Sequence, residues 1–330
     1  MKASWYSRNG DANDVLQVGE LPTPEPGPGE VRVRLLTSGV NPSDVKSRRA
    51  KPVTDPLVVP HSDGAGVIDR VGPGVPASRV GERVWVWNGQ WQRALGTACE
   101  YMALPEAQAV QLPDQTDFAA GACLGIPALT AVQAVTWAER LAGDLRGQSV
   151  LVTGASSAVG HYITQLVTLA GGRVIGTVGS EAKAAHARAA GMQEAIFYKT
   201  ESVPERVKAL TQGQGVSVII DMDFSTTAGW AAEALKPHGQ VVCYGSNALQ
   251  QTFEYRPWLF NSLGVKFFLV YELSPADRAL AVARLTALLA QGALKHSIGP
   301  RFSLDQMVQA HQAVEAGQSI GNVVVDIAPN

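Results

Sequence analysis

The sequence is poor in cysteine, in net charge and in long apolar runs, and each shortage excludes a class of protein. Three scattered cysteines, Cys99, Cys123 and Cys243, favour free thiols in a reducing compartment over a disulfide-stapled secreted domain. No apolar run approaches the ~20 residues that span a bilayer, and the first residues lack the apolar core of a signal peptide. The net charge of −2 favours neither nucleic acid nor an anionic membrane as partner. We therefore expect a cytoplasmic protein.

Apolar residues are abundant, and their distribution changes along the chain. They make up 46% of the 330 residues, and the length suggests about two domains at roughly 150 residues each. The first 125 residues alternate in short stretches such as 31–35 and 81–86, separated by Pro/Gly-rich breaks such as 21–30. Many short strands with frequent turns predict a partly open β-barrel.

From Ser149 onward, apolar runs alternate with helical patterns. Six parallel strands joined by crossover helices form a complete doubly wound, dinucleotide-binding sheet. We expect strands at 149–153, 173–178, 194–198, 216–221, 240–245 and 265–270, with helices at 128–142, 159–170, 181–190, 203–212 and 226–236. The tail is expected to rejoin the β-rich part through a helix from Pro275 to 292, a strand at 296–303, a helix at 305–316 and a strand at 322–327.

The turn between the first of these strands and its helix is the first candidate site. The pattern G-x-G-x-x-G is absent, because Gly154, Ser157 and Gly160 occupy the three-residue steps. Such turns often only connect two elements. Here, however, the turn follows an apolar strand and opens a helix without an acidic residue, which favours binding of a pyrophosphate by backbone N–H groups and the helix N-terminus.

The end of the second strand bears on which nucleotide binds. NAD enzymes usually place Asp or Glu there to bind the ribose 2′-hydroxyl. Here Gly179 and Ser180 follow the strand, with Lys183 one helical turn later. Ser180 and Lys183 suit a 2′-phosphate. The alternative is that Ser180 is only an N-cap and Lys183 a solvated lysine, and Glu181 would repel a phosphate. The pattern favours NADPH.

These motifs carry a family resemblance over nearly the whole chain. It rests on GVNPSDVKSR (39–48), HSDGAGVIDRVGPGV (61–75), GERVW (81–85), TGASSAVG (153–160), VGSEAK (178–183) and GQVVCYG (239–245). The chain resembles the medium-chain dehydrogenase/reductase superfamily, in its zinc-free quinone oxidoreductase (zeta-crystallin-like) branch. The resemblance implies an α/β fold in which a GroES-like β-rich catalytic domain, residues 1–125 and 271–330, encloses an inserted Rossmann NADPH-binding domain, residues 126–270.

The resemblance also implies positions that bind NADPH. The pyrophosphate contacts would be Ser157, Ala158, Val159 and Gly160, and the 2′-phosphate contacts Ser180, Lys183 and Tyr198. Contacts elsewhere on the cofactor would be Thr130, Tyr244, Gly245, Phe268, Val270 and Asn322. The family turn A-x-x-G-x-x-G begins with glycine here and has serine in the middle, which removes no backbone donor.

The superfamily's zinc-ligand positions are mostly occupied by other residues here. The superfamily's zinc alcohol dehydrogenases use a Cys in the segment matching 39–44 and a His-Glu pair near 61–62. Here Asn41 and Pro42 lie in the first segment, Ser62 replaces the glutamate, and the four-cysteine lobe is missing. We expect no metal, with His61 a hydrogen-bonded structural residue.

Without a metal, hydride transfer depends on positioning and hydrogen bonds. By resemblance, Asn41 and Asp44 form the family's Asn-x-x-Asp element at the cleft between the domains. Asp44 is equally a helix cap, and Lys46, where relatives often have tyrosine, is either an oxyanion donor or a solvated lysine. Trp87 and Trp91 either stack on a flat substrate or pack between the domains.

We therefore expect an NADPH-dependent reductase of quinones or α,β-unsaturated carbonyls that acts on a small molecule. One rival is a 2-enoyl thioester (acyl-CoA) reductase with Arg48, Arg49 and Lys51 lining a basic groove. Another is an NADPH-binding protein without turnover. Strand 265–270, at the edge of the sheet, is expected to pair with its copy in a homodimer, as the family often does.

Overall fold

The computed structural model describes residues 1–327, which divide into two compact units. The first unit comprises Met1–Ile126 together with Leu289–Gly292 and the stretch from His296 onward. The second comprises Pro127–Leu288 and Ala293–Lys295. Within the described residues, no helix is both long and apolar enough to cross a membrane.

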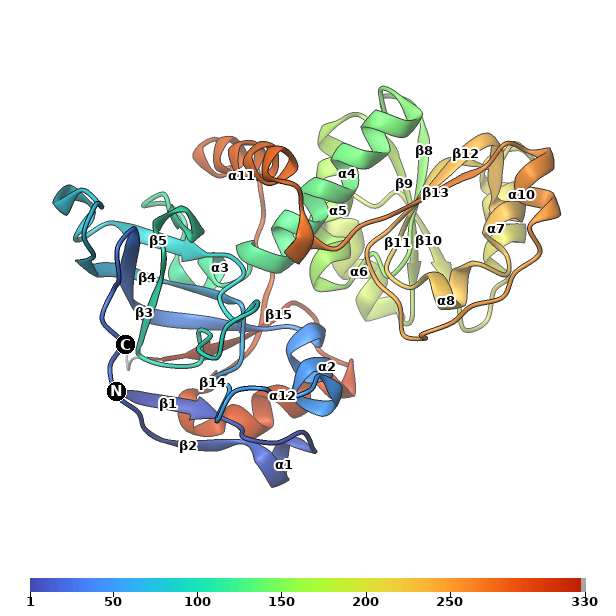
Figure 1. Ribbon diagram of the computed structural model, residues 1–330. Coiled ribbons are helices and arrows are strands. Elements are labelled where there is room, and N and C mark those ends of the chain that lie inside the picture. The colour runs from blue at the N-terminus through green and yellow to red at the C-terminus, as the bar shows by residue number, and fades with distance from the viewer. Residues whose placement is uncertain (328–330) are drawn as a thin grey trace. The chain divides into compact units, whose positions relative to one another are not determined.

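The first unit is built on a mostly antiparallel sheet (Figure 1). Its order is β14-β15-β3-β4-β5-β7, with β6 paired to β3, and β1 and β2 form a separate ribbon. The strands are β1 (Lys2–Trp5), β2 (Gln17–Glu20), β3 (Glu30–Val40), β4 (Asp63–Val71), β5 (Arg83–Val86), β6 (Tyr101–Pro105), β7 (Ala109–Gln111), β14 (Ile298–Ser303) and β15 (Asn322–Asp326). The helices are α1 (Ala12–Val15), α2 (Pro42–Ala50), α3 (Phe118–Gly121) and α12 (Met307–Ala316).

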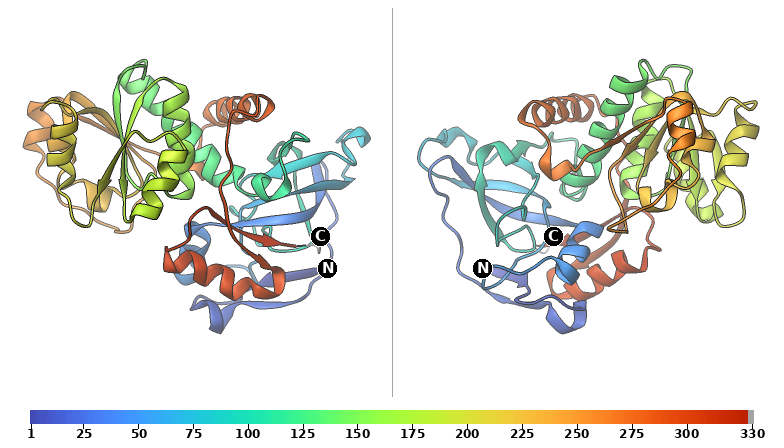
Figure 2. Two further views of the ribbon diagram at one scale, coloured as in Figure 1. Left: turned by 180° about the vertical axis from the view of Figure 1, so that it is seen from behind. Right: turned by 45° about the vertical axis from the view of Figure 1, so that its right-hand side comes forward.

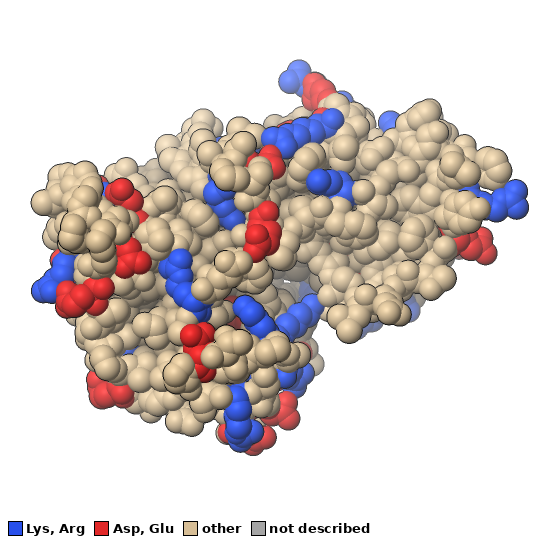
Figure 3. All heavy atoms as spheres, in the orientation of Figure 1, with Lys and Arg blue, Asp and Glu red and all other residues tan. Residues whose placement is uncertain are grey.

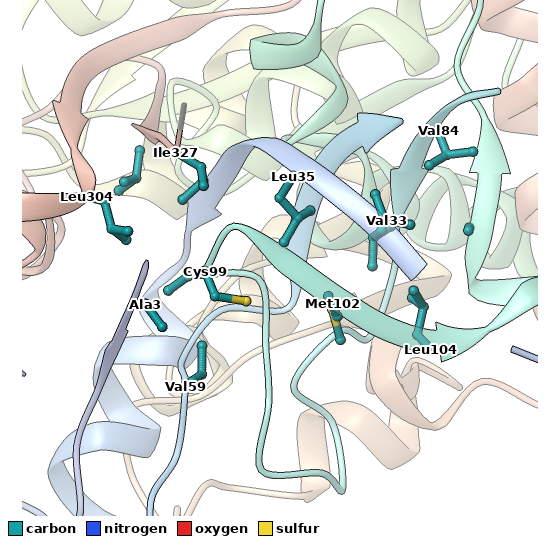
Figure 4. Close-up of a cluster of buried hydrophobic side chains, with 14 of the residues drawn as sticks. Ala3, Val33, Leu35, Val59, Val84, Cys99, Met102, Leu104, Leu304 and Ile327 are labelled. Carbon is teal, nitrogen blue, oxygen red and sulfur yellow. The ribbon is translucent and has the colours of Figure 1, made fainter. Parts of the chain in front are cut away.

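The core of this unit draws on both ends of the chain. Strand β15 pairs with β3 in antiparallel register, Val324 opposite Gly39. Side chains of β3, β6 and β15 then meet those of α12 in one buried cluster, part of which is drawn in Figure 4. Because β15 and α12 come from the C-terminal stretch, the expected return of the tail to the β-rich part is observed.

The second unit is a six-stranded parallel sheet. Its order, β10-β9-β8-β11-β12-β13, reverses direction between β8 and β11, so their carboxyl ends border the crevice where doubly wound sheets bind ligands. The strands are β8 (Ser149–Val152), β9 (Arg173–Val178), β10 (Glu194–Phe197), β11 (Val216–Asp221), β12 (Leu235–Cys243) and β13 (Gly264–Phe267).

Helices cover both faces of this sheet (Figures 1 and 2). One face packs against α4, α5 and α6, and the other shares a buried cluster with α7, α9 and α10. The helices are α4 (Leu129–Ala142), α5 (Ala158–Leu169), α6 (Glu181–Ala189), α7 (Val203–Leu210), α8 (Phe224–Thr227), α9 (Ala231–Ala234), α10 (Arg256–Phe260) and α11 (Pro275–Ala290). With both faces covered, all six residues of β11 are buried, and four of them are apolar.

Three local expectations were wrong. The helix expected at 226–236 is two short helices, α8 and α9, separated at Gly229–Trp230. The last strand, β13, ends at Phe267 instead of continuing to 270. The second unit also extends past the expected boundary at 270, because α11 is tied to α4 by the Arg284–Glu139 and Arg140–Asp277 ion pairs.

Truncating a buried side chain of the parallel sheet should destabilise the second unit. Leu151 on β8 is fully buried in the cluster beneath α7 and α9. We expect Leu151→Ala to lower the free energy of unfolding by roughly 2–5 kcal/mol, measured by urea denaturation. Leu169→Ala, on the exposed end of α5, is the control and should change it by less than about 0.5 kcal/mol. Equal effects of the two substitutions would contradict the assigned packing.

Candidate functional site

The turn after β8 depends on two glycines. Gly154 adopts a φ of +62°, a conformation that residues with a Cβ rarely adopt. At Gly160 a Cβ would stand 2.2 Å from the carbonyl oxygen of Gly154, so the first turn of α5 packs directly on the turn backbone. Ser157, at the middle position, is the N-cap of α5, and its Oγ accepts a hydrogen bond from the Gly160 N–H at 3.0 Å.

Neighbouring strands hold this turn in place. The N–H of Gly154 donates to Thr177 Oγ1 on β9 at 2.9 Å. Thr153 Oγ1 donates to Asp221 Oδ1 at the end of β11 at 2.8 Å, and accepts from the N–H of Met222 at 2.9 Å. The carboxyl ends of β8, β9 and β11 are therefore locked together at the point where the strand order reverses.

The residues of the turn fit a pyrophosphate. Ala158 and Val159 occupy the first two positions of α5, where helix geometry provides no intrahelical acceptor for the N–H groups. No acidic residue lies in the first turn of this twelve-residue helix, and its dipole favours an anion. The expected residues Ser157, Ala158, Val159 and Gly160 thus form the N-cap and first turn of α5, a position suited to an anion.

The end of β9 brings together the three residues expected to read the 2′-phosphate. Ser180 is the N-cap of α6, and its Oγ accepts from the backbone N–H of Lys183 at 3.4 Å. Tyr198 is exposed, and its hydroxyl lies 3.3 Å from where a Cβ on Gly179 would stand. The carboxylate of Glu181 forms an ion pair with Arg188 at 2.6 Å, which reduces the repulsion expected between it and a phosphate.

Tyr244, Gly245 and Phe268, which are also expected to contact the cofactor, directly follow strands of the same sheet. At Gly245, which follows β12, a Cβ would stand 2.4 Å from the carbonyl oxygen of Met222, so only glycine fits. Burial, and secondarily the negative charge of Asp221, raises the pKa of the Tyr244 hydroxyl. Phe268 donates its N–H to the carbonyl of Cys243 at 3.1 Å. Thr130 on α4 and Val270 after β13 are buried in the same unit.

The expected catalytic residues of the first unit surround the start of α2. Asn41 is the N-cap of α2; its N–H donates to Asp44 Oδ2 at 2.7 Å, and its Nδ2 donates to Asp63 Oδ2 at 2.9 Å. The cap interpretation of Asp44 is therefore the one the structure shows. Two buried carboxyl groups fix the Asn41 amide, and burial raises the pKa of both, that of Asp44 to about 7.

The remaining expected residues differ in their surroundings. Lys46 is exposed on α2. Trp87 is half-buried and donates its indole N–H to the Ala107 carbonyl at 3.1 Å, whereas the ring of Trp91 lies beneath the Lys51 ammonium, 4.9 Å from the ring centroid. Asn322 opens β15 and donates to the Ser297 carbonyl at 2.9 Å, an interaction within the first unit.

Behind α2, a buried arginine meets two stacked histidines. Arg48 forms an ion pair with Glu315 on α12, and its Nε donates to His311 Nδ1 at 3.4 Å. Because arginine has only donors, His311 Nδ1 accepts, and the proton of the neutral ring lies on Nε2. That proton is donated to His61 Nε2 at 3.0 Å. Burial lowers the pKa of both rings, that of His311 to about 3.

The chain of hydrogen bonds continues beyond His61, and each residue again donates to the next. The Nδ1 of His61 donates to Ser38 Oγ at 2.9 Å, which donates to Thr97 Oγ1 at 2.7 Å, and Thr97 donates to the Asp63 carbonyl at 2.5 Å. Every member is buried, and His61 is held at a φ of +76°. Both ring nitrogens of His61 are thus engaged. Among residues 1–327, no group of three or more His, Cys, Asp or Glu side chains is arranged to hold a metal ion.

Three residues that support the site were not singled out from the sequence: Asp63, Thr177 and Asp221. Asp63 lies in the HSDGAG motif, where an acid flanked by small residues is a signal for a buried, hydrogen-bonded carboxyl group. Thr177 and Asp221 are polar residues at the ends of apolar strands, and that position marks the carboxyl edge of the sheet.

The buried Asp44 should make stability depend on pH. Its pKa rises from an ordinary 3.8 to about 7 on folding, so between these values the folded chain binds more protons than the unfolded chain. The free energy of unfolding should therefore fall as pH rises through this window, and Asp44→Asn should flatten the fall in urea titrations. Asp14→Asn, at an exposed position, is the control. An unchanged slope in Asp44→Asn would refute the assignment.

Comparison with known proteins covers both units. A model described as a zinc-binding dehydrogenase matches residues 158–287, and one described as an alcohol dehydrogenase GroES-like domain matches residues 27–114. The expected architecture, a doubly wound parallel sheet with a GroES-like β-rich domain, is thereby confirmed.

Full-length relatives match as well. The quinone oxidoreductase of Pseudomonas aeruginosa is 30% identical over 318 residues, 94% of this chain and 95% of its own. The 2-haloacrylate reductase of a Burkholderia species is 28% identical and covers 98% of each chain. A mycobacterial protein solved in complex with NADPH has a TM-score of 0.87 at 26% identity, covering 99% of this chain and 100% of its own. The chain belongs to the medium-chain dehydrogenase/reductase superfamily, in its zinc-free quinone oxidoreductase branch.

Proposed function

We propose that this protein is an NADPH-dependent reductase that transfers hydride to a quinone or an α,β-unsaturated carbonyl compound. The observation that carries the proposal is the carboxyl edge of the parallel sheet. There the N-terminus of α5 follows β8, Ser180 and Lys183 follow β9, and Tyr198, which follows β10, lies against Gly179. The carboxylate in this segment, Glu181, pairs with Arg188. The similarity to a quinone oxidoreductase and to a 2-haloacrylate reductase supports the same class of acceptor.

The second unit provides the binding groups for the cofactor. The N–H groups of Ala158 and Val159 would bind the pyrophosphate, and the Lys183 ammonium would neutralise the 2′-phosphate. Tyr244, Gly245, Phe268, Val270 and Thr130 would line the rest of the site. When bound, NADPH supplies the hydride from C4 of its nicotinamide ring.

The first unit provides donors for the acceptor oxygen. The Nδ2 of Asn41 donates to Asp63, and the Asn41 side chain also hydrogen-bonds to Asp44, so both carboxyl groups fix the orientation of this amide. We propose that the amide contacts a substrate oxygen or the nicotinamide ribose. Charge that develops on this oxygen during hydride transfer is stabilised by such a preorganised donor. We propose Lys46 as a second donor and Trp87 and Trp91 as apolar surfaces for a flat substrate.

The three basic residues expected to line a groove for the thioester alternative all have partners in the structure. Arg48 is buried and paired with Glu315, Arg49 pairs with Asp11 at 3.2 Å, and the Lys51 ammonium lies over Trp91. Lys and Arg side chains are interspersed with Asp and Glu on the face drawn in Figure 3, without a large field of one sign. These contacts favour a small uncharged acceptor over a carrier thioester or a nucleic acid.

The activity and its cofactor preference can be tested together. We expect NADPH oxidation, followed at 340 nm, with quinones or enals but not with enoyl-CoA. Lys183→Ala should raise KM for NADPH about tenfold, the equivalent of one charge-assisted interaction, and leave KM for NADH unchanged. Lys208→Ala, on α7, is the control.

Two results would contradict these proposals. Tight NADPH binding without oxidation by any acceptor in the panel would indicate the non-catalytic alternative. Equal effects of Lys183→Ala on both cofactors would show that this side chain does not read the 2′-phosphate.

We further propose a homodimer formed through strand β13. Among residues 1–327, β13 pairs with β12 alone and ends the strand order, so its other edge presents unpaired backbone groups. Exposed apolar side chains lie on and around it: Leu259, Phe260, Phe267 and Leu269. An apolar edge strand of this kind is suited to pairing with a second copy, which would extend the sheet.

The dimer prediction has a closely matched control. Phe267 and Leu169 are both 57% exposed, but Leu169 lies on α5, away from the sheet edge. We expect size-exclusion chromatography with light scattering to show a dimer for the wild type and Leu169→Asp, and a monomer for Phe267→Asp. A monomeric wild type, or a dimer that survives Phe267→Asp, would exclude this interface.

We also propose that the protein works in the cytoplasm. All three cysteines are free and buried, which is the expected state in a reducing compartment.

A further inference from the structure

A solvent-exposed methionine, Met222, lies against the turn at residues 154–160. Among Met102, Met192, Met222 and Met307, only Met222 is exposed, at 40%, whereas the others are at most 4% exposed. Met222 directly follows β11, at the point where the strand order reverses. Its sulfur lies 2.2 Å from where a Cβ on Gly154 would stand, so the thioether covers the first glycine of the turn.

We propose that Met222 is a site of reversible oxidation by hydroperoxides and that its sulfoxide weakens NADPH binding. The sulfur attacks one peroxide oxygen, so an S–O bond forms, the O–O bond breaks, and the second oxygen leaves with a proton as water or an alcohol. Sulfur is oxidised by two electrons and the peroxide is reduced by two. A methionine sulfoxide reductase with a dithiol reverses the step, because the oxygen leaves as water while the dithiol becomes a disulfide.

Oxidation would change the chemistry of the turn at the point where phosphate is expected. A thioether is apolar and a weak acceptor, whereas a sulfoxide is polar and its oxygen carries partial negative charge. Beside Gly154 this oxygen would repel phosphate oxygens and compete for the N–H groups that open α5. The Met222 N–H is bonded to Thr153, directly before Gly154, so the backbone holds the side chain close to the turn.

The cysteines are poor competing targets for a peroxide. All three are buried, and burial raises their pKa, to about 12 for Cys99 and about 11 for Cys243. The thiolate is the form that reacts with peroxide, so these thiols are protected. Of the methionine and cysteine side chains after Met1, Met222 is therefore the one that is both exposed to solvent and next to the turn at Gly154.

The test uses hydrogen peroxide on the purified, full-length protein. After the peroxide is removed, peptide mass spectrometry should show 16 Da added at Met222 before Met192, the mass of one oxygen. The Kd for NADPH, measured by fluorescence titration, should rise about tenfold, which corresponds to one lost charge-assisted hydrogen bond. Sulfoxide reductase with dithiothreitol should restore the Kd, and NADPH present during oxidation should slow modification of Met222.

Two variants separate Met222 from general oxidative damage. In Met222→Leu the Kd, compared with that of the untreated variant, should no longer respond to peroxide. In Met192→Leu, which alters the buried methionine packed on Gly176, the response should persist. Loss of affinity on oxidation of Met222→Leu, or an oxidised Met222 with unchanged Kd, would overturn the inference.

The inference rests on the proposed binding of NADPH, but the two fail differently. If untreated protein does not bind NADPH, the proposed function fails. If it binds NADPH and oxidation of Met222 leaves the Kd unchanged, only this inference fails.

Discussion

The contact between Gly160 and the carbonyl of Gly154 is the constraint on which the nucleotide-binding unit depends. With only 2.2 Å available to a Cβ, the chain must carry glycine at position 160, and α5 must begin directly on the end of β8. That geometry points the free N–H groups of the helix into the crevice where the strand order reverses. The middle position of the family pattern makes no such demand. Ser157 therefore replaces glycine there and caps the helix.

In the first unit, buried hydrogen bonds fix the position of a helix, α2. Arg48 joins α2 to Glu315 and His311 on α12, which come from the other end of the chain. A buried polar group without a partner costs free energy, so each member requires the next to be in place. The chain of donors runs in one direction from Arg48 to the Asp63 backbone, whose side chain in turn holds Asn41. The position of α2, and with it that of Asn41, is thus determined by residues far away in sequence.

Periodicity in the sequence was sufficient for the parallel sheet but not for its irregular parts. Apolar runs flanked by turn residues located β8, β9 and β11 to within a residue, because buried parallel strands are continuously apolar. After β11 the predicted helix was wrong. The composition of 226–236 favours one helix, but the backbone breaks it at Gly229–Trp230. Strand β12 starts at Leu235, five residues before its expected start, although its pairing with β11 is irregular until Gln240.

Side-chain partners were harder to predict than elements. The partners of Asn41 and Asp44 follow partly from local capping rules, since N-cap and N3 residues are neighbours in any helix. The bond between His61 and His311 spans 250 residues, and no local pattern encodes it. His61 is a hydrogen-bonded structural residue, as the sequence predicts, but its partners His311 and Ser38 are not predictable from the sequence.

The surroundings of His61 bear on how a zinc-free member of this superfamily handles charge on its acceptor. In the zinc alcohol dehydrogenases the matching histidine gives a lone pair to the metal. Here both ring nitrogens are committed, one to His311 and one to Ser38, so the ring has no lone pair to offer. Under the proposed function, negative charge that develops on the acceptor oxygen must be met by hydrogen-bond donors. Asp63 and Asp44 both hydrogen-bond to the Asn41 side chain, so these buried carboxyl groups position the proposed donor.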